Sequence, residues 1–408
     1  MVKKRLPVGL RTQLDYLYGL DFYRKKMDEA GIVPGDILSL KDFEGFPFTT
    51  HGEFVKEMGR KNPPYGSFYP PGVVRINLTP SGDHLLPIFH TSRDLESMHQ
   101  VCHRSLGAAG VTRNDICAVT FGYHLFIAGL FYQGQLETYG AKVIPLGPGE
   151  TDRAVDIINR HGVTVLVANP SFALKLGSSG MNRIRILFAG GEPLTSVPGY
   201  KDRIRQALGR DLVIIDSYSM SECIPIARNC AMETGLHIMD EFVYAEIIDP
   251  ETGKNLENGR MGELVLTHIR KEAQPLLRYR TGDLAELVET PCHCGRHVTM
   301  PRGISGRTGE MLKVKGVKLY PSQIKAIINE HGTGTGFRLT IRSEKGVDRL
   351  ILTLADIPGA RPKLKNLRHA LRKATLLNFD EIVFRDHLEE GPMVSDERDV
   401  LSAHYGLA

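Results

Sequence analysis

The 408-residue chain lacks any apolar run near the roughly 20 residues that a membrane-spanning helix needs. Its first residues, MVKKRLPVGL, carry positive charge but are not followed by the apolar stretch of a secretory signal. The sequence therefore predicts a cytoplasmic protein without a membrane partner.

Concentrated charge of one sign is also missing, because the formal net charge of +4 is spread along the chain. Nucleic-acid binders gather basic residues in a patch or tail, so no nucleic-acid partner is expected. Six cysteines in a long chain without a signal peptide favour metal binding or free thiols over a disulfide scaffold.

Residues 8–60 are predicted to be helical, and from about residue 95 helical stretches alternate with short apolar runs. The runs are DICAVTFGY, AKVIPLG, VTVLVANP, IRILFAGG and DLVIIDSYS. Val- and Ile-rich runs that follow helices predict βαβ units and a parallel sheet. Each run ends in Gly, Pro, Asn, Ser or Tyr, at the sheet edge where α/β folds place ligands.

The pattern changes after residue 240 to FVYAEIIDPETGKNLENGRMGELVLTHI, which predicts two antiparallel strands of a barrel-like subdomain. A boundary is predicted near GISGRTGEMLKVKGVKLYPSQI, because four glycines lie in this short basic stretch. The fold class is therefore α/β. Residues 1–305 form a large N-terminal domain with parallel sheets and the barrel-like subdomain, and residues 306–408 form a small α+β domain.

Four motifs occur in one order along the chain: SYSMSE, LLRYRTGDL, CHCGR and GRTGEMLKVKGVKLYPSQI. Together with FYRKKMDEAGI, FGYHLFIAGL, NPSFAL and AGGEPLT, they resemble the phenylacetate-CoA ligase branch of the adenylate-forming superfamily over nearly the whole chain. The resemblance implies a mobile C-terminal domain, with an active site between the domains. It also implies that ATP activates a carboxylic acid as an acyl-adenylate, and that a thiol such as coenzyme A accepts the acyl group. A homodimer is left open.

The nucleotide site implied by the resemblance draws on AGGEP, DSYSMSE, RYRTGDL and GRTGE. Its residues are Gly190, Gly191, Glu192 and Asp216 for adenine, Tyr218 for stacking on its face, Asp283 for ribose, Ser221 beside phosphate, Glu222 for Mg²⁺ and Arg307 beside Asp283. Glycines let backbone approach a ring, an acceptor-only carboxylate suits ribose hydroxyls, and Mg²⁺ prefers carboxylate oxygens. Without the resemblance, the same residues fit a strand-to-helix turn, a helix cap and surface charges.

FGYHLFIAGL offers Tyr123, His124 and Phe126 beside glycines. In the family this region lines the acyl pocket, and aromatic walls suit a flat aryl acid. A place in the hydrophobic core is the alternative for the same aromatic residues.

A structural zinc ion is predicted from cysteine and histidine residues that flank the barrel-like segment. The ligand set is Cys230, His237, Cys292 and Cys294, with Cys223, His293 and His297 as substitutes. One tetrahedral zinc ion would join two loops that are distant in sequence.

The expected phosphate loop departs from the family, which has a Ser/Thr/Gly-rich loop near SSGTTGKP where this chain has TPSGDH. The groups available for phosphate are Thr79, Ser81, Gly82 and His84. Pro80 removes a backbone donor and Asp83 adds negative charge, so a weaker grip on the phosphates of ATP is expected.

The C-terminus departs as well, because family ligases place a lysine in its last loop and the last lysine here is Lys373. Arg385 and Arg398 are the permanent cations beyond it, and arginine is not a geometric equivalent of lysine. Gly309 stands where the family usually has an acidic hinge residue, and glycine still allows rotation there.

Two alternatives to acyl-CoA formation follow from these departures. The ending GPMVSDER resembles that of a synthetase that adenylylates the deazaflavin coenzyme of methanogens, which favours adenylyl transfer to a hydroxyl. Acyl transfer to an amine is a related alternative. The second alternative is a non-catalytic relative that binds a nucleotide or an aryl ligand.

Overall fold

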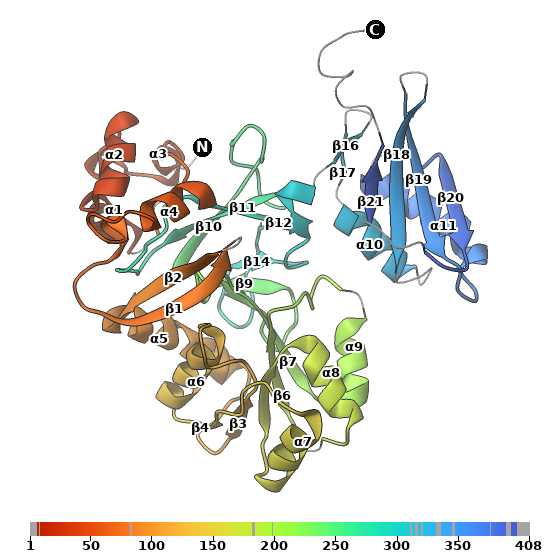
Figure 1. Ribbon diagram of the computed structural model, residues 1–408, viewed down its shortest axis with the longest axis horizontal. Coiled ribbons are helices and arrows are strands. Elements are labelled where there is room, and N and C mark those ends of the chain that lie inside the picture. Colours follow the sequence, from red (N-terminus) through yellow and green to blue (C-terminus); the bar gives the residue numbers. More distant parts are fainter. Residues whose placement is uncertain are drawn as a thin grey trace. The chain divides into compact units, whose positions relative to one another are not determined.

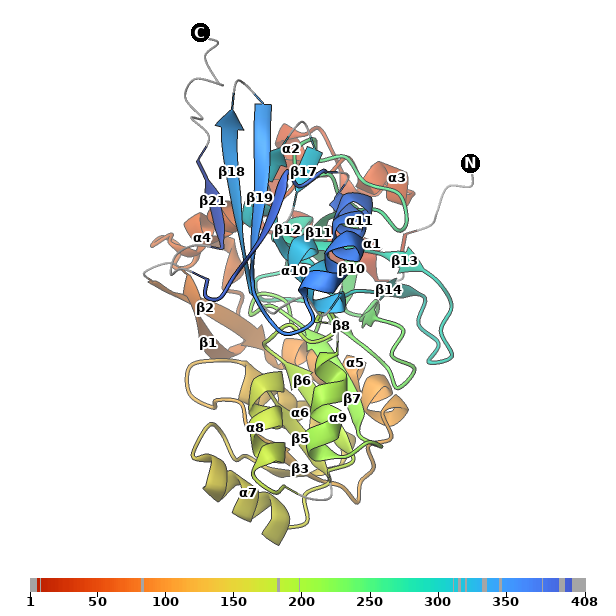
Figure 2. The same ribbon diagram turned by 90° about the vertical axis from the view of Figure 1, so that its right-hand side faces the viewer.

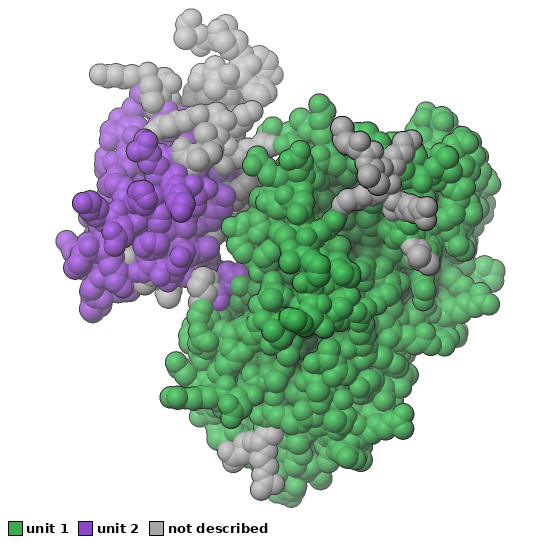
Figure 3. Space-filling view, turned by 180° about the vertical axis from the view of Figure 1, so that it is seen from behind, with its two compact units in different colours: residues 1–195, 199–304 green, residues 196–198, 305–408 purple. Residues whose placement is uncertain are grey.

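The computed structural model describes residues 6–7, 9–81, 84–181, 184–197, 199–310, 312–314, 317–319, 321–331, 336–344, 347–375, 377–388 and 393–397. The chain forms two compact units (Figure 3). The first comprises residues 1–195 and 199–304, and the second comprises residues 196–198 and 305–408. The division lies next to the domain boundary predicted from the sequence.

The N-terminal region is helical, as its sequence predicts. Its elements are α1 (Leu10–Tyr18), α2 (Asp21–Glu29), η1 (Pro34–Asp36), α3 (Leu40–Phe43), α4 (His51–Met58) and η2 (Gly66–Phe68). Helix α4 begins with a capping box, in which Thr50 accepts from the backbone of Glu53 and the Glu53 carboxylate accepts from the backbone of Thr50. This cap fixes His51 as the first residue of the helix.

A mixed sheet forms the centre of the first unit, with the strand order β13-β14-β9-β8-β7-β6-β5-β3-β4. Its parallel strands are β3 (Ile116–Val119), β4 (Lys142–Ile144), β5 (Val165–Ala168), β6 (Ile186–Gly190) and β7 (Val213–Tyr218). The five apolar runs therefore form the predicted parallel sheet. Short antiparallel strands extend it: β8 (Ala227–Arg228), β9 (Leu236–Ile238), β13 (Val288–Glu289) and β14 (Val298–Met300).

Helices cover both faces of the parallel strands (Figures 1 and 2). They are α5 (Ser92–Ala108), α6 (Ala128–Tyr139), α7 (Thr151–Arg160), α8 (Pro170–Ser178) and α9 (Tyr200–Leu208). Alternate residues of β5 face opposite sides: Val165 and Val167 join the core that includes α5 and α6, whereas Leu166 and Ala168 join the core beneath α7, α8 and α9. Burial on both faces explains why the sequence shows continuous apolar runs here.

Two antiparallel pieces complete the first unit. Strands β1 (Val73–Ser81) and β2 (His84–Thr91) form a hairpin, and β10 (Val243–Ile248), β11 (Met261–His268) and β12 (Tyr279–Glu286) lie side by side in a sheet. Strands β10 and β11 are the two runs predicted as the antiparallel piece after residue 240.

The second unit is a small α+β domain, as predicted. Its elements are β15 (Gly306–Arg307), η3 (Thr308–Glu310), β16 (Leu312–Val314), β17 (Val317–Leu319), α10 (Pro321–Glu330), β18 (Phe337–Glu344), β19 (Val347–Ala355), η4 (Arg361–Lys363), α11 (Leu364–Thr375), β20 (Glu381–Arg385) and β21 (Val394–Asp396). A sheet of order β20-β19-β18-β21 packs against both α-helices around a leucine- and isoleucine-rich core. Among the described residues of the whole chain, no helix is both long enough and apolar enough to cross a membrane.

Candidate active site

Residues 79–81 and 84 of the predicted phosphate loop lie in the β1–β2 hairpin, and Thr79 joins this hairpin to the SYSMSE motif. Ser221 Oγ donates to Thr79 Oγ1 at 2.9 Å, across 142 residues of sequence. Two of the three hydroxyl groups expected beside phosphate are therefore neighbours. Gly82 and Asp83 lie outside the described residues, as does the side chain of His84.

His51 joins the same hairpin to two further motifs, and sequence reasoning missed it. Its Nε2 lies 3.0 Å from Ser81 Oγ, and its Nδ1 lies 2.9 Å from Tyr279 Oη. The same Nδ1 lies 3.8 Å from Oε1 of Glu222. One imidazole thus brings together the hairpin, the predicted magnesium ligand and the RYRTGDL motif.

Tyr218 and Asp283 also meet, although 65 residues separate them. The Tyr218 hydroxyl donates to Asp283 Oδ2 at 2.5 Å, and Asp283 is buried. The residues predicted for the adenine face and the ribose are therefore in direct contact. Glu222 is mostly buried, and its carboxylate Oε1 lies 3.8 Å from His51 Nδ1. A carboxylate is a ligand that Mg²⁺ prefers, and this role of Glu222 stays a prediction.

Gly190 ends strand β6 and Gly191 follows it, beside two stacked aromatic rings that the sequence did not single out. The Phe121 and Tyr132 rings are 5.3 Å apart at an interplanar angle of 11°. A Cβ at Gly190 would lie 3.2 Å from the Tyr132 hydroxyl, and one at Gly191 would lie 2.7 Å from Asn169 Nδ2. Gly191 also has φ +80°, so both the space and the backbone favour glycine.

Glu192 and Asp216, both predicted for adenine, are hydrogen-bonded within the protein. Glu192 accepts from the backbone N–H and the hydroxyl of Ser171, at the start of α8. Asp216 Oδ2 accepts from the Thr195 backbone at 2.9 Å and from its hydroxyl at 2.6 Å. Burial raises the pKa of Asp216. Their contacts with adenine stay predictions.

The three predicted acyl-pocket residues divide between two environments. His124 and Phe126 are exposed on the loop before α6, with ring centroids 6.4 Å apart. Asn77 Nδ2 donates to the Phe126 carbonyl at 3.2 Å and so fastens this loop to the hairpin. Tyr123 instead points toward Gly147, and burial raises the pKa of its hydroxyl to about 12. Tyr123 is partly buried against the hydrophobic core, and its place in an acyl pocket stays a prediction.

Four residues predicted for the site or the hinge belong to the second unit: Arg307, Gly309, Lys373 and Arg385. Arg307 is exposed in β15, so its place beside Asp283 stays a prediction. Lys373 is exposed on α11, ahead of Arg385 in β20, and Arg398 lies outside the described residues. A Cβ at Gly309 would meet no heavy atom within 4 Å.

The predicted zinc ligands form one compact group, with Cys230 and His237 buried. One ligand atom each from Cys230, His237, Cys292 and Cys294 lies within 4.8 Å of every other. The proposed substitutes Cys223, His293 and His297 are not part of the group, and all six cysteines of the chain are free thiols. Three thiols and one imidazole are a donor set that zinc accepts.

Local hydrogen bonds shape this Cys/His cluster. The Gly295 N–H donates to the Cys292 carbonyl at 2.8 Å, which closes a turn that presents Cys292 and Cys294. His237 Nδ1 lies 2.8 Å from Thr299 Oγ1. When Nδ1–H donates to that hydroxyl, the lone pair on Nε2 is left for a metal ion.

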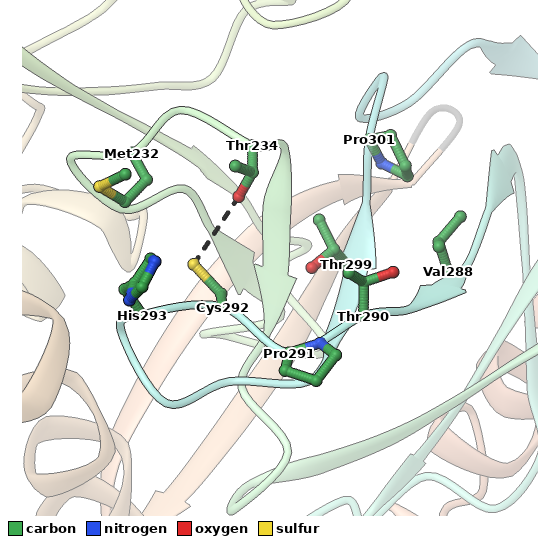
Figure 4. A pocket seen from close by; sticks show the side chains of 9 residues that line it. All are labelled: Met232, Thr234, Val288, Thr290, Pro291, Cys292, His293, Thr299 and Pro301. Carbon is green, nitrogen blue, oxygen red and sulfur yellow. Dashed lines mark hydrogen bonds between the residues drawn. The ribbon is translucent and has the colours of Figure 1, made fainter.

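A cavity of about 230 Å³ adjoins the cluster (Figure 4). The figure shows Cys292 and Thr234 pointing toward one another, with the threonine oxygen 3.8 Å from the sulfur. Thr299, which contacts His237, also lines the cavity. The Cys292 side of the cluster is therefore the side that small molecules can reach.

Comparisons with known proteins identify a family and several relatives. A family model described as AMP-binding enzyme matches residues 90–269. The chain is 35% identical over 336 residues to the phenylacetate-coenzyme A ligase of Thermus thermophilus, covering 78% of this chain and 73% of the relative. It is 34% identical to the enzyme of the same name from Pseudomonas putida and 33% identical to that of Escherichia coli, with the same coverage.

A solved structure extends the likeness to both units. An open conformation of 2-hydroxyisobutyryl-CoA ligase, in complex with 2-HIB-AMP and CoA, matches with a TM-score of 0.80. The match covers 97% of this chain and 93% of that protein at 23% sequence identity. At this identity the likeness shows the fold alone.

Proposed function

The chain belongs to the phenylacetate-coenzyme A ligase family of adenylate-forming enzymes, and from this membership we propose that it activates an aryl carboxylic acid for transfer to coenzyme A. Adenylate-forming acyl-CoA ligase activity is the family's chemistry; the aryl nature of the acid is the proposal. It is supported by the relatives' names and by the Phe121–Tyr132 stack beside Gly190 and Gly191.

The main support for a nucleotide site here is the set of contacts between the β1–β2 hairpin and the SYSMSE motif. Ser221 reaches Thr79, and Glu222 lies near His51, which reaches Ser81. These residues offer hydroxyl, carboxylate and imidazole groups at one place, as the handling of a nucleotide phosphate requires. Glu222 would hold Mg²⁺, which offsets negative charge on the phosphate oxygens when bound.

The chemistry has two balanced steps. A carboxylate oxygen of the acid attacks the α-phosphorus of ATP, and the bond to the bridging oxygen breaks to release pyrophosphate. The coenzyme A sulfur, after losing its proton, then attacks the acyl carbon, and AMP leaves. The chain's part in the first step is to hold the phosphates and exclude water; Tyr218 and Asp283 would hold the nucleoside in both steps.

A panel of aryl and alkyl acids tests this proposal. Pyrophosphate release and thioester mass are measured for the wild type and for Glu222→Gln. The expected result is a higher kcat/KM for aryl acids, with pyrophosphate release lowered at least tenfold in the variant. Equal kcat/KM for alkyl acids would overturn the aryl assignment while leaving the ligase chemistry in place.

Adenylyl transfer to a hydroxyl is the second candidate, favoured by the segment GPMVSDER and its resemblance to the deazaflavin-coenzyme synthetase. Its product retains AMP, whereas a thioester product releases it. Mass spectrometry of the products formed from labelled ATP therefore separates the two functions.

We also propose that the Cys/His cluster holds a structural zinc ion. The ligands would be Cys230, His237, Cys292 and Cys294, and Thr299 would orient the imidazole. The cluster joins the segment after β8 to the turn between β13 and β14, so the metal would stabilise the antiparallel end of the large sheet.

A further inference from the structure

The cap of α4 places His51 beside the β1–β2 hairpin, and no sequence motif includes this residue. Thr50 and Glu53 form the capping box, and Lys26 Nζ pairs with the Glu53 carboxylate at 2.7 Å. These contacts fix the helix start from both sides. The backbone at His51 is therefore fixed by the cap, while the His51 side chain is half-exposed.

The imidazole of His51 makes its contacts through both ring nitrogens. Ser81 Oγ is 3.0 Å from Nε2, and Tyr279 Oη is 2.9 Å from Nδ1. Hydroxyl groups both donate and accept, so these partners do not fix the tautomer of the ring. The hydroxyl oxygen that accepts from the ring N–H can accept from another donor instead, which leaves the ring N–H for a ligand.

Among the described residues of the hairpin, Pro80 has no backbone N–H to offer at the place that His51 reaches. It stands between Thr79, which accepts from Ser221, and Ser81, whose hydroxyl contacts His51. A ring N–H supplied from α4 would add a donor at this place.

We propose that His51 is a positioning residue for the β- and γ-phosphates of ATP. It contacts Ser81 and lies 3.8 Å from the Glu222 carboxylate, and its ring N–H donates to the polyphosphate that leaves as pyrophosphate. The residue forms no covalent bond and takes no proton from the acid. This inference rests on the proposed function, because it assigns a role within the adenylation step.

Binding measurements separate this role from a merely structural one. In His51→Leu, calorimetry is expected to show ATP affinity lowered about tenfold, the worth of one hydrogen bond to a charged group, and AMP affinity changed less than twofold. His51→Gln, which keeps a donor and an acceptor, should recover part of the loss. His161→Gln, an exposed histidine after α7, is the matched control and should bind both nucleotides as the wild type does.

The two half-reactions give a second readout. Acid-dependent exchange of pyrophosphate into ATP should fall at least tenfold in His51→Leu, while thioester formation from supplied acyl-adenylate stays within twofold. Equal losses in both half-reactions, or equal losses of ATP and AMP binding, would overturn the proposal, as would wild-type ATP affinity. A wild type that turns over no acid would defeat the proposed function, yet the comparison of ATP with AMP would still decide the role of His51.

Discussion

The hydroxyl of Tyr218 donates a 2.5 Å hydrogen bond to Oδ2 of Asp283. Strand β7 ends at Tyr218, and Asp283 lies within β12, so this contact joins the parallel sheet to the β10–β11–β12 sheet. A hydrogen bond from a hydroxyl to a carboxylate fixes the orientation of the carboxylate.

Replacing either partner should weaken nucleoside binding by different amounts. Asp283→Asn removes the acceptor-only group. Because a hydrogen bond to a charged group contributes about 1.5–3 kcal/mol, the Kd for AMP is expected to rise tenfold or more. Tyr218→Phe keeps the ring for stacking and should raise the Kd about threefold. Calorimetry with AMP checks both, and a larger loss in Tyr218→Phe than in Asp283→Asn would contradict the assignment of ribose to Asp283.

Removal of one cysteine should release the metal ion from the Cys/His cluster. Cys292→Ser is expected to lower the zinc content from about one ion per chain to near zero, and also the midpoint of thermal unfolding, because metal binding and folding are coupled. Elemental analysis and thermal unfolding with and without a chelator measure the two effects.

The adjacent His293 gives the matched control for the zinc prediction. It is exposed and lies outside the group of four ligands. His293→Ala should therefore keep both the zinc content and the unfolding midpoint of the wild type. If the wild-type protein is purified without zinc and added zinc does not change its unfolding midpoint, the zinc prediction is wrong.

The buried pair Lys271–Asp94 should carry a large share of the first unit's stability. Their Nζ and Oδ2 atoms lie 3.0 Å apart, with side chains 3% and 1% exposed. Asp94→Asn leaves the Lys271 ammonium buried without its countercharge, and the expected loss is about 3–5 kcal/mol. Urea unfolding measures it. Glu29→Gln, in the exposed pair with Lys25, should change stability by less than about 1 kcal/mol; a similar effect of both variants would show that burial does not set the cost.

His99 should make the folded state lose stability in mild acid. Burial, with the charges of Arg75 and His103, lowers its pKa to about 4. The unfolded chain takes up a proton near pH 6.5 that the folded chain refuses, so stability is retained above pH 6.5 and falls toward pH 4, by up to about 1.4 kcal/mol per pH unit.

Substitution of His99 isolates this contribution. In His99→Gln the free energy of unfolding should fall less steeply with decreasing pH, because up to one fewer proton is taken up on unfolding. The stability of the variant relative to the wild type should therefore rise as the pH falls from 6.5 to 4. Unfolding by urea across this range measures the difference. His161→Gln, a change at an exposed position, is the control and should leave the slope unchanged. Parallel pH profiles for wild type and His99→Gln would refute the linkage.

The sequence predicted the parallel strands well, because strands buried on both faces read as continuous runs such as that around Val165–Ala168. It missed β8, β13 and other strands of two or three residues, which have no room for a periodic pattern. The resemblance named Ser221 and Glu222, but it could not name His51. That residue reaches the site through the capping box of α4 and through pairing across 30 residues, neither of which a local motif encodes.

Restoring a donor in the hairpin is the most direct way to test whether its sequence limits ATP binding. Pro80 is exposed and pairs with Leu85, so Pro80→Ser adds a backbone N–H without disturbing a buried contact. One additional hydrogen bond to phosphate should tighten ATP binding about tenfold and leave AMP binding unchanged. Calorimetry on Pro80→Ser, with the exposed Pro71→Ser as control, measures both. Unchanged ATP affinity would mean that the phosphates are held by other groups, such as His51 and Glu222, and that the proline does not weaken the site.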